Sequence, residues 1–318
     1  MQEYVANSDI FTVDALYHQA QLASIHLIRS NQRIAVVDTG TTNSIPQIQQ
    51  ALAELRLDFS HIDYVILTHI HLDHAGGASA LMNLCSKASL VVHPKGVRHM
   101  VNPQKLIDGT IAVYGEEAFK SLYGEILPIE AGRIIQPADG EVIDFAERPL
   151  KFIDTPGHAN HHHSIIDAQT NSIFTGDTLG VGYRALRDDD KAFVAATTTP
   201  VQFNPQALHA SIDKVMVYKP DWLYLTHYSA LKPRAQNIAG LHEQIDDFVS
   251  LTQYCYETFS ESADFEQQLS QQLLEYLVRR CLNELPSIEE EVVRRWLKLD
   301  AQLNAQGLVF WWQYRRTK

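Results

Sequence analysis

The chain has 318 residues, which is enough for two domains of ordinary size. Hydrophobic residues make up 45% and charged residues 20%, and these proportions exclude a disordered or fibrous protein. The 26 Lys and Arg against 38 Asp and Glu give a formal net charge of −12, which opposes nonspecific binding to nucleic acid. The sequence has no signal-peptide pattern, no apolar run of membrane-spanning length and 3 widely spaced cysteines. We therefore expect a cytoplasmic protein without a membrane segment.

Up to about residue 230, short β-rich runs alternate with stretches in which apolar residues recur every three or four positions. Strands that alternate with helices indicate the α/β fold class. The expected elements, in chain order, are strands at 24–28 and 34–37, a helix over 44–57, a strand at 64–67, a helix over 78–84 and a strand at 90–92.

After Pro233 the pattern becomes helical throughout. Apolar residues at helical spacing predict helices over 238–259 and 265–277. A third helix is expected after Pro286, because Ser287 and Glu290 form a capping-box pattern, and Gly307 is its expected end. The sequence therefore predicts an α/β domain over residues 1–235 and a C-terminal helical region over residues 236–318.

The 15 histidines are the one unusual count in the composition, and a dense group of them lies in the segment Thr-His-Ile-His-Leu-Asp-His-Ala-Gly-Gly at 68–77. In an extended chain, His69 and His71 point the same way and can bind one metal ion. Asp73 and His74 follow on a turn, from which they can reach a second ion. The pattern predicts a metal site, since a solvated turn rarely combines these residue types.

Further candidate ligands each follow a β-rich run. His158 lies on the Pro-Gly turn of Thr-Pro-Gly-His, Asp177 lies in Gly-Asp-Thr, and His227 ends a run that matches 63–69 at four of seven positions. Histidines at the carboxyl edge of strands are typical of sites in open α/β sheets. Each of these residues alone has an ordinary structural explanation, whereas together they supply what two metal ions require.

The order of these segments over residues 1–230 resembles the metallo-β-lactamase-fold hydrolases, which include glyoxalase II, lactonases and ribonuclease Z-type nucleases. The resemblance implies an αββα sandwich, here with a C-terminal helical appendage, and makes residues 1–235 the catalytic domain. It also implies a ligand set: His69, His71 and His158 for the first metal, Asp73, His74 and His227 for the second, and Asp177 as the bridge. Asp38 matches a family Asp that orients a ligand.

Metal-assisted hydrolysis is the chemistry expected from such a site, with attack by a hydroxide between the metals on a small ester, thioester or lactone. Asp73 is the expected catalytic residue that orients the water and passes on its proton. Imidazole and carboxylate ligands suit two divalent ions, with Zn²⁺ expected and Fe or Mn open. A mononuclear-iron sulfur dioxygenase, a phosphodiesterase of the same fold and a non-catalytic binding protein stay open as alternatives. The expected partner is a small-molecule substrate rather than nucleic acid or membrane, and a homodimer is compatible with the helical region.

The remaining histidines fall into two groups. The run His161–His163 follows the ligand candidate in a Pro-Gly-His-Ala-x-His-His pattern, which resembles a subgroup of the family, and we expect it to lie mostly in a loop near the site. Tyr183 follows the Asp177 segment and is expected to be packed rather than catalytic. The other histidines are expected on the surface or on helices, not as ligands: His18, His26, His61, His93, His99, His209 and His242.

Overall fold

The computed structural model describes residues 1–189, 191–198, 201–259 and 264–316. The chain forms two compact units. The first unit comprises residues 1–154, 161–176 and 220–230, and the second comprises residues 155–160, 177–219 and 231–318. The expected domain boundary at residue 235 stays a prediction, although the first of the long C-terminal helices begins at Ala235.

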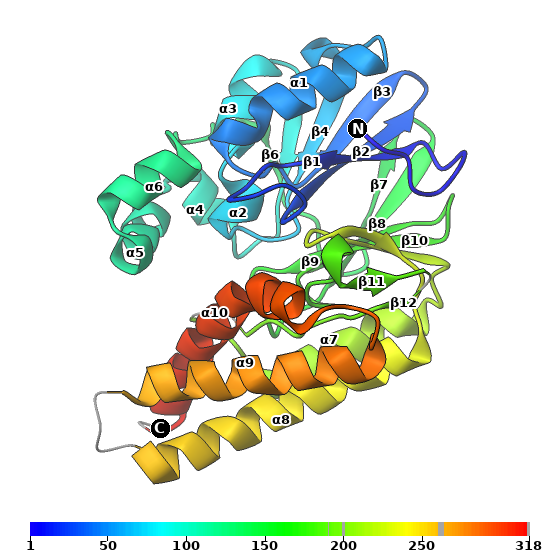
Figure 1. The fold of residues 1–318 in the computed structure, drawn as a ribbon. Coiled ribbons are helices and arrows are strands. Elements are labelled where there is room, and N and C mark those ends of the chain that lie inside the picture. The colour runs from blue at the N-terminus through cyan, green and yellow to red at the C-terminus, as the bar shows by residue number, and fades with distance from the viewer. Residues whose placement is uncertain (190, 199–200, 260–263, 317–318) are drawn as a thin grey trace. The chain divides into compact units, whose positions relative to one another are not determined.

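The first unit contains a mixed sheet whose strand order follows the sequence, β1-β2-β3-β4-β5-β6. Strands β1 to β3 pair antiparallel, whereas β3 to β6 pair parallel. The parallel pairs need crossover connections, which include α1 (Ile45–Glu54) and α3 (Ala78–Leu84). Both helices lie along one face of this sheet (Figure 1). The strands are β1 (Ile10–Asp14), β2 (Ser24–Ser30), β3 (Arg33–Val37), β4 (Ile62–Ile66), β5 (Ser89–Val91) and β6 (Ile134–Ile135).

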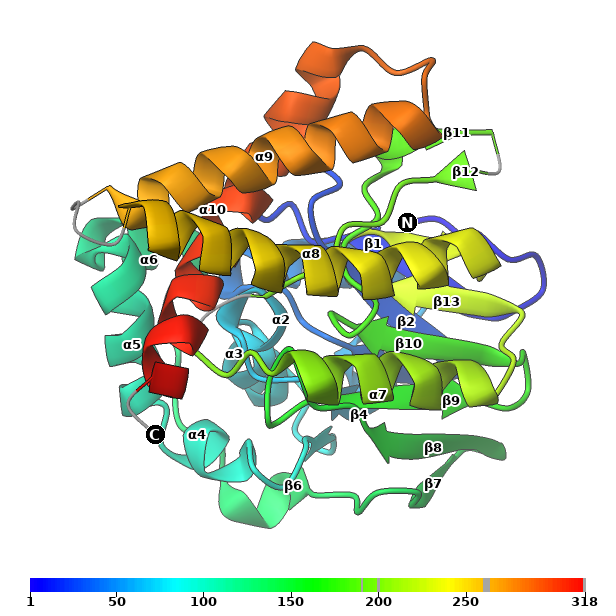
Figure 2. The same ribbon diagram turned by 90° about the horizontal axis from the view of Figure 1, so that it is seen from below.

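A second sheet has the strand order β14-β13-β10-β9-β8-β7. Its strands from β7 to β10 are antiparallel neighbours, and β13 joins β10 in parallel. Figure 2 shows β13, β10, β9, β8 and β7 side by side in this order. The strands are β7 (Val142–Phe145), β8 (Arg148–Asp154), β9 (His163–Asp167), β10 (Ser172–Gly176), β13 (Trp222–Leu225) and β14 (Ser229–Leu231).

Apolar side chains from both sheets form one core cluster. Ile28 and Val37 come from the first sheet, and Phe152, Phe174 and Tyr224 come from the second. Each of these side chains is almost completely buried, and full burial of such a side chain contributes about 1.5–3 kcal/mol. Stacking of the sheets through this core agrees with the layered α/β fold that the resemblance implies, so the predicted fold class is confirmed.

The other helices of the first unit are short, and those of the second unit include the longest of the chain. Within the described residues, no helix is both long and apolar enough to cross a membrane. The first unit adds α2 (Leu72–Ala75), α4 (Val97–Val101), α5 (Gln104–Tyr114), α6 (Glu116–Tyr123) and the 3₁₀ turns Thr42–Ser44, Phe59–His61 and Ala131–Arg133. The second unit contains the 3₁₀ turn Arg184–Leu186, the hairpin β11 (Arg187–Asp188) and β12 (Lys191–Ala192), and the helices α7 (Pro205–Val217), α8 (Ala235–Phe259), α9 (Phe265–Glu284) and α10 (Glu290–Arg316).

Both predicted ends of the last helix are wrong. Helix α10 begins at Glu290 rather than directly after Ser287, whose hydroxyl donates instead to Asp188 Oδ2 at 2.6 Å. The helix also continues past Gly307 to Arg316. Glycine costs about 1 kcal/mol inside a helix, but the apolar face continues beyond it, since Leu308 is fully buried. A tertiary hydrogen bond of Ser287 therefore replaces the predicted cap, and packing outweighs the helix-ending signal of Gly307.

The expected exposure of His26 is wrong as well, because this residue lies in β2 and is 1% exposed. Its ring contacts the Thr12 hydroxyl through Nδ1 at 3.3 Å and the Leu225 carbonyl through Nε2 at 3.2 Å. Burial lowers the pKa of His26 to about 4, despite the opposing influence of Asp38 and the Leu225 carbonyl. The folded protein therefore holds this ring neutral at pH values where the unfolded chain already binds a proton.

We expect this histidine to make the protein acid-sensitive. The unfolded state binds more protons below pH 6.5, so the contribution of His26 is complete above that pH and is lost as the pH falls towards 4. Between pH 7.5 and 4.5 the loss is about 2–3 kcal/mol from the difference between the two pKa values. Urea unfolding of the wild type and of His26→Gln at both pH values measures it. Equal losses for the two proteins would contradict the prediction.

Candidate metal centre

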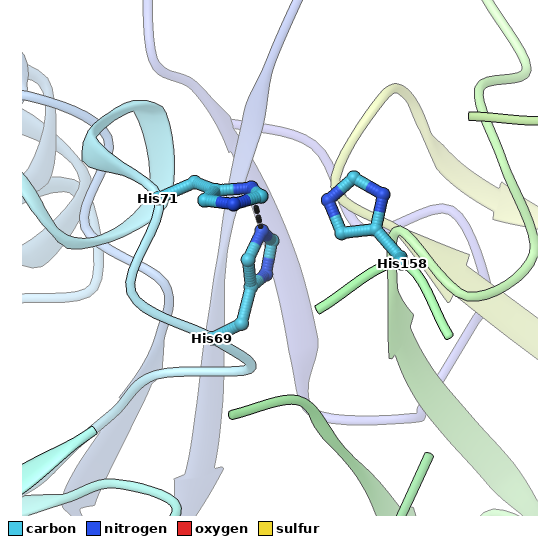
Figure 3. A group of neighbouring side chains, drawn as sticks. All are labelled: His69, His71 and His158. Carbon is cyan, nitrogen blue, oxygen red and sulfur yellow. Dashed lines mark hydrogen bonds between the residues drawn. The ribbon is translucent and has the colours of Figure 1, made fainter. Parts of the chain in front are cut away.

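The segment between β4 and α2 presents the first pair of candidate ligands. His69 and His71 lie on the connection between these elements, and His71 is the cap residue of α2. The Nε2 atom of His69 lies 2.8 Å from Nδ1 of His71. Figure 3 shows this contact between the two rings and also draws His158. The two imidazoles therefore meet within the first unit.

A second group in the first unit consists of Asp73, His74 and His227. Each offers one ligand atom, and the three atoms lie within 4.8 Å of one another. Asp73 Oδ2 is 3.6 Å from His74 Nε2 and 3.3 Å from His227 Nε2. One carboxylate and two imidazoles at such separations are a donor set that suits a divalent transition-metal ion. The residues present therefore fit the group that the sequence predicts.

The Nδ1 atom of each imidazole in this group faces a hydrogen-bond acceptor. His74 Nδ1 lies 2.9 Å from Asp38 Oδ2, and His227 Nδ1 lies 2.8 Å from the carbonyl oxygen of Leu22. A ring that donates through Nδ1 keeps the lone pair of Nε2 for a metal, which is the usual arrangement around metal-bound histidines. Both Nε2 atoms face Asp73, so the donors are already oriented.

Asp38 holds several parts of this site together. It directly follows β3, is fully buried, and has a φ of 56°, a conformation that Asp tolerates better than most residues. Its carboxylate accepts from the backbone N–H and hydroxyl of Thr68 and from the hydroxyl of Thr226 at 2.8–3.0 Å. Thr68 and Thr226 follow strands of different sheets, β4 and β13. The repeated Thr-His pairs thus place each threonine on Asp38 and the following histidine among the candidate ligands.

The remaining candidate ligands belong to the second unit. Asp177 follows β10 directly, and His158 lies on the loop that joins β8 to β9. Within the unit, His158 Nε2 lies 3.5 Å from Asp177 Oδ2. The hydroxyl of Thr197 lies 3.0 Å from His158 Nδ1 and donates to the Asp177 carbonyl at 3.1 Å. The Thr197 hydroxyl therefore orients His158 as Asp38 orients His74.

The run His161–His163 lies in the interior, and its last residue begins β9 instead of continuing a loop. His162 is fully buried and stacks on His69, with ring centroids 4.9 Å apart. A Cβ on Gly176 would come within 2.4 Å of His162 Nε2 and 2.8 Å of Thr68 Cβ, and this glycine has a φ of 49°. Glycine is therefore required where β10 passes the buried rings, next to Asp177.

Burial also sets the charge of these rings. Desolvation lowers the pKa of His163 to about 3, and its Nε2 lies 2.8 Å from the Leu67 carbonyl. Burial is the main cause that lowers the pKa of His161 as well, with neighbouring histidines acting in the same direction. Since a second positive charge would repel a bound cation, neutral rings suit the interior of a metal site.

Two of the groups that orient the candidate ligands were not predicted from the sequence. Neither Thr197 nor the Leu22 carbonyl has a local signal, because each contact depends on residues far apart in the chain. His93, expected on the surface or on a helix, lies in a loop, is 3% exposed and contacts Asp154 Oδ1 at 3.3 Å. Tyr183 is packed as expected, and its hydroxyl donates to Asp300 at 3.0 Å. The ligand assignments themselves stay predictions.

A family model described as the metallo-beta-lactamase superfamily matches residues 20–227, more than half of the chain. The chain belongs to this family. At the level of the family it is a metallohydrolase, in agreement with the donor groups above.

Individual relatives are distant. The metallo-beta-lactamase fold-containing protein ST1585 of Sulfurisphaera tokodaii is 24% identical over 221 residues, which cover 67% of this chain and 76% of that protein. The acyl-coenzyme A thioesterase MBLAC2 of Gallus gallus is 24% identical over 183 residues, covering 54% of this chain and 63% of that protein. Among solved structures, the metallo-beta-lactamase family protein TTHA1429 of Thermus thermophilus matches with a TM-score of 0.63 at 17% identity, covering 97% of this chain and 94% of that chain. These similarities support the fold and leave the substrate open.

Proposed function

We propose that this metallohydrolase cleaves small thioesters, with esters and lactones as related substrates, and that it uses two divalent ions, most simply Zn²⁺. The observation that carries the proposal is the Asp73, His74 and His227 group. Its carboxylate faces two imidazoles, and the Nδ1 atom of each imidazole faces a hydrogen-bond acceptor. The name of the thioesterase relative favours a thioester over other acyl compounds.

Each candidate ligand has a defined part in the proposal. His69, His71 and His158 would hold one ion, Asp73, His74 and His227 the other, and Asp177 would bridge them. Held by these residues, two divalent ions would supply an activated water and polarisation of the scissile carbonyl oxygen. The imidazoles supply neutral donors, and the carboxylates of Asp73 and Asp177 balance part of the ionic charge.

Asp73 is the member of its group that solvent reaches most easily. Its side chain is 23% exposed, compared with 0% for His74 and 8% for His227. A carboxylate that is anchored by imidazoles but reachable from solvent can orient a water molecule and move its proton to the departing thiolate. His74 and His227 keep Asp73 in place, and Asp38 keeps His74 in place. Because Asp73 is both held in place and reachable from solvent, we propose it as the catalytic residue.

Metal analysis combined with a substrate panel tests the function. The purified protein is expected to contain at least two divalent ions per chain, from the ligand count of a two-metal site, and to hydrolyse thioesters faster than phosphodiesters. Removal of the metal by a chelator should abolish hydrolysis, and added Zn²⁺ should restore it. One iron per chain with oxygen uptake on a persulfide would favour the sulfur dioxygenase. No metal and no hydrolysis of any ester would favour a binding protein.

The substrate is proposed to be a small molecule rather than nucleic acid or a membrane. The net charge of −12 supports this, because a phosphate backbone or an anionic bilayer would be repelled. A cytoplasmic location and a homodimer stay predictions.

A further inference from the structure

Helices α7 and α8 of the second unit carry the same short pattern. Residues 209–213 and residues 242–246 both contain His-x-x-Ile-Asp. The two isoleucines, Ile212 and Ile245, are fully buried. Because four residues make about one helical turn, each histidine lies on the same side of its helix as the aspartate that follows it. Each helix therefore presents one imidazole and one carboxylate beside its buried isoleucine.

The two histidines meet directly. The rings of His209 and His242 are stacked, with centroids 4.9 Å apart and an angle of 4° between their planes. Their Nδ1 atoms lie 2.6 Å from each other. The side chains are about a quarter exposed, at 25% and 27%, so small ions can reach them from solvent.

The carboxylates are arranged crosswise around this pair. Asp246 of α8 faces His209 of α7, with 3.1 Å between Oδ1 and Nε2. Asp213 of α7 faces His242 of α8, with 3.3 Å between Oδ1 and Nε2. The Nε2 atom of each imidazole thus faces the carboxylate of the opposite helix. This is the carboxylate–histidine arrangement that commonly orients metal ligands, and it occurs here twice.

The hydrogen-bonding capacity of imidazole determines what the pair can bind. A neutral imidazole has one N–H donor and one acceptor nitrogen. If each ring donates through Nε2 to the carboxylate that faces it, both Nδ1 atoms present lone pairs to each other. Two acceptors at 2.6 Å repel unless a cation lies between them or beside them. A positive charge at the two Nδ1 atoms would therefore stabilise this arrangement.

We propose that His209 and His242 form a metal site separate from the Asp73 centre, for a divalent transition-metal ion such as Zn²⁺. Imidazole nitrogens suit this class of ion, and the open side of the site leaves room for water as the remaining ligands. Zn–N bonds of about 2.05 Å at a tetrahedral angle place the two nitrogens about 3.3 Å apart. The exposed rings need to separate by about 0.7 Å from their present 2.6 Å to accept the ion.

Such an ion would join α7 to α8. Helix α7 precedes β13, which ends next to the Thr226-His227 pair, whereas α8 begins the C-terminal helical segment. An ion that binds only the folded arrangement stabilises it by mass action. The proposed role is therefore structural: the ion would hold α8 against α7 within the second unit.

Measuring the zinc content of matched variants tests the site. Wild type, His209→Ala, His242→Ala and His61→Ala are equilibrated by dialysis against the same excess of free Zn²⁺ at pH 7.5, and bound zinc is measured per chain. His61 is the control because it also faces an aspartate, Asp58 at 2.9 Å, but has no second imidazole in that pair. We expect one zinc fewer per chain in His209→Ala and in His242→Ala, and no loss in His61→Ala. Far-UV circular dichroism shows whether each variant is folded.

The orienting carboxylates give a second readout. Asp213→Asn and Asp246→Asn are expected to keep the site but weaken zinc binding by about 10–100-fold. Added Zn²⁺ should also raise the melting temperature of the metal-loaded wild type, and this rise should be lost in His242→Ala. Equal zinc content in all variants would overturn the proposal. A histidine pair that holds only a proton would give that same result.

Discussion

Replacing Asp73 by alanine is expected to abolish thioester turnover while the fold stays intact. The carboxylate is the solvent-reachable member of the group it forms with His74 and His227, and it is the proposed carrier of the proton. Loss of such a group lowers kcat by about 10²–10⁴-fold. Because Asp73 is also a proposed ligand, the metal content should fall in parallel. Steady-state kinetics and metal analysis of the purified variant measure both effects.

Asp108→Ala is the matched control for this experiment, since Asp108 is an exposed aspartate on α5. It should keep full turnover and full metal content. Asp73→Asn separates the two roles of Asp73: the amide preserves the size of the side chain but cannot accept a proton from water. Undiminished turnover in Asp73→Ala, with normal circular dichroism, would remove Asp73 from the mechanism.

Replacing Asp38 by alanine is expected to lower the stability of the first unit strongly. The buried carboxylate accepts from Thr68, Thr226 and His74, so its removal leaves several buried donors unsatisfied. Breaking a buried charged network of this kind costs about 3–5 kcal/mol. Denaturant unfolding of the metal-free protein measures this loss without a contribution from bound ions.

Asp38→Asn shows whether Asp38 also orients a ligand. Asparagine tolerates the positive φ at this position and keeps an acceptor oxygen, so most of the stability should return. The amide is a weaker acceptor for His74 Nδ1, so metal affinity should stay about 10–100-fold below that of the wild type. If Asp38→Ala unfolds like the wild type, or if Asp38→Asn binds metal with full affinity, the role assigned to Asp38 is wrong.

The sequence could nominate candidate ligands because they occupy short, dense patterns. In the segment 68–77, an extended stretch followed by a helical turn brings His69, His71, Asp73 and His74 to one place through local geometry alone. The two Thr-His pairs can also be recognised in the sequence, but the contacts of their threonines cannot be predicted from it. Only the fold shows that Thr68 and Thr226 converge on Asp38.

The errors at the ends of the last helix and in the histidine environments have a common cause. A capping pattern at Ser287 and a glycine at 307 are local preferences of about 1 kcal/mol. Burial of one apolar side chain contributes more than that, and the buried Leu308 accounts for a helix that continues past Gly307. His26 and His93 have polar side chains and no local signal of burial, yet each lies in the interior with a hydrogen-bonding or ionic partner.

The sequence by itself determined the α/β class, the family resemblance and the seven candidate ligands, because these depend on residue type, periodicity and short spacing. The tertiary structure decided which ligand Asp38 faces, and it added Thr197 and the Leu22 carbonyl as groups that orient the other ligands. It also decided that the matching patterns of α7 and α8 face each other. These contacts join residues that are 33 or more positions apart, and no local interaction fixes such pairings. They form only when the sheets and helices pack, since packing buries apolar surface and requires the enclosed polar groups to find partners.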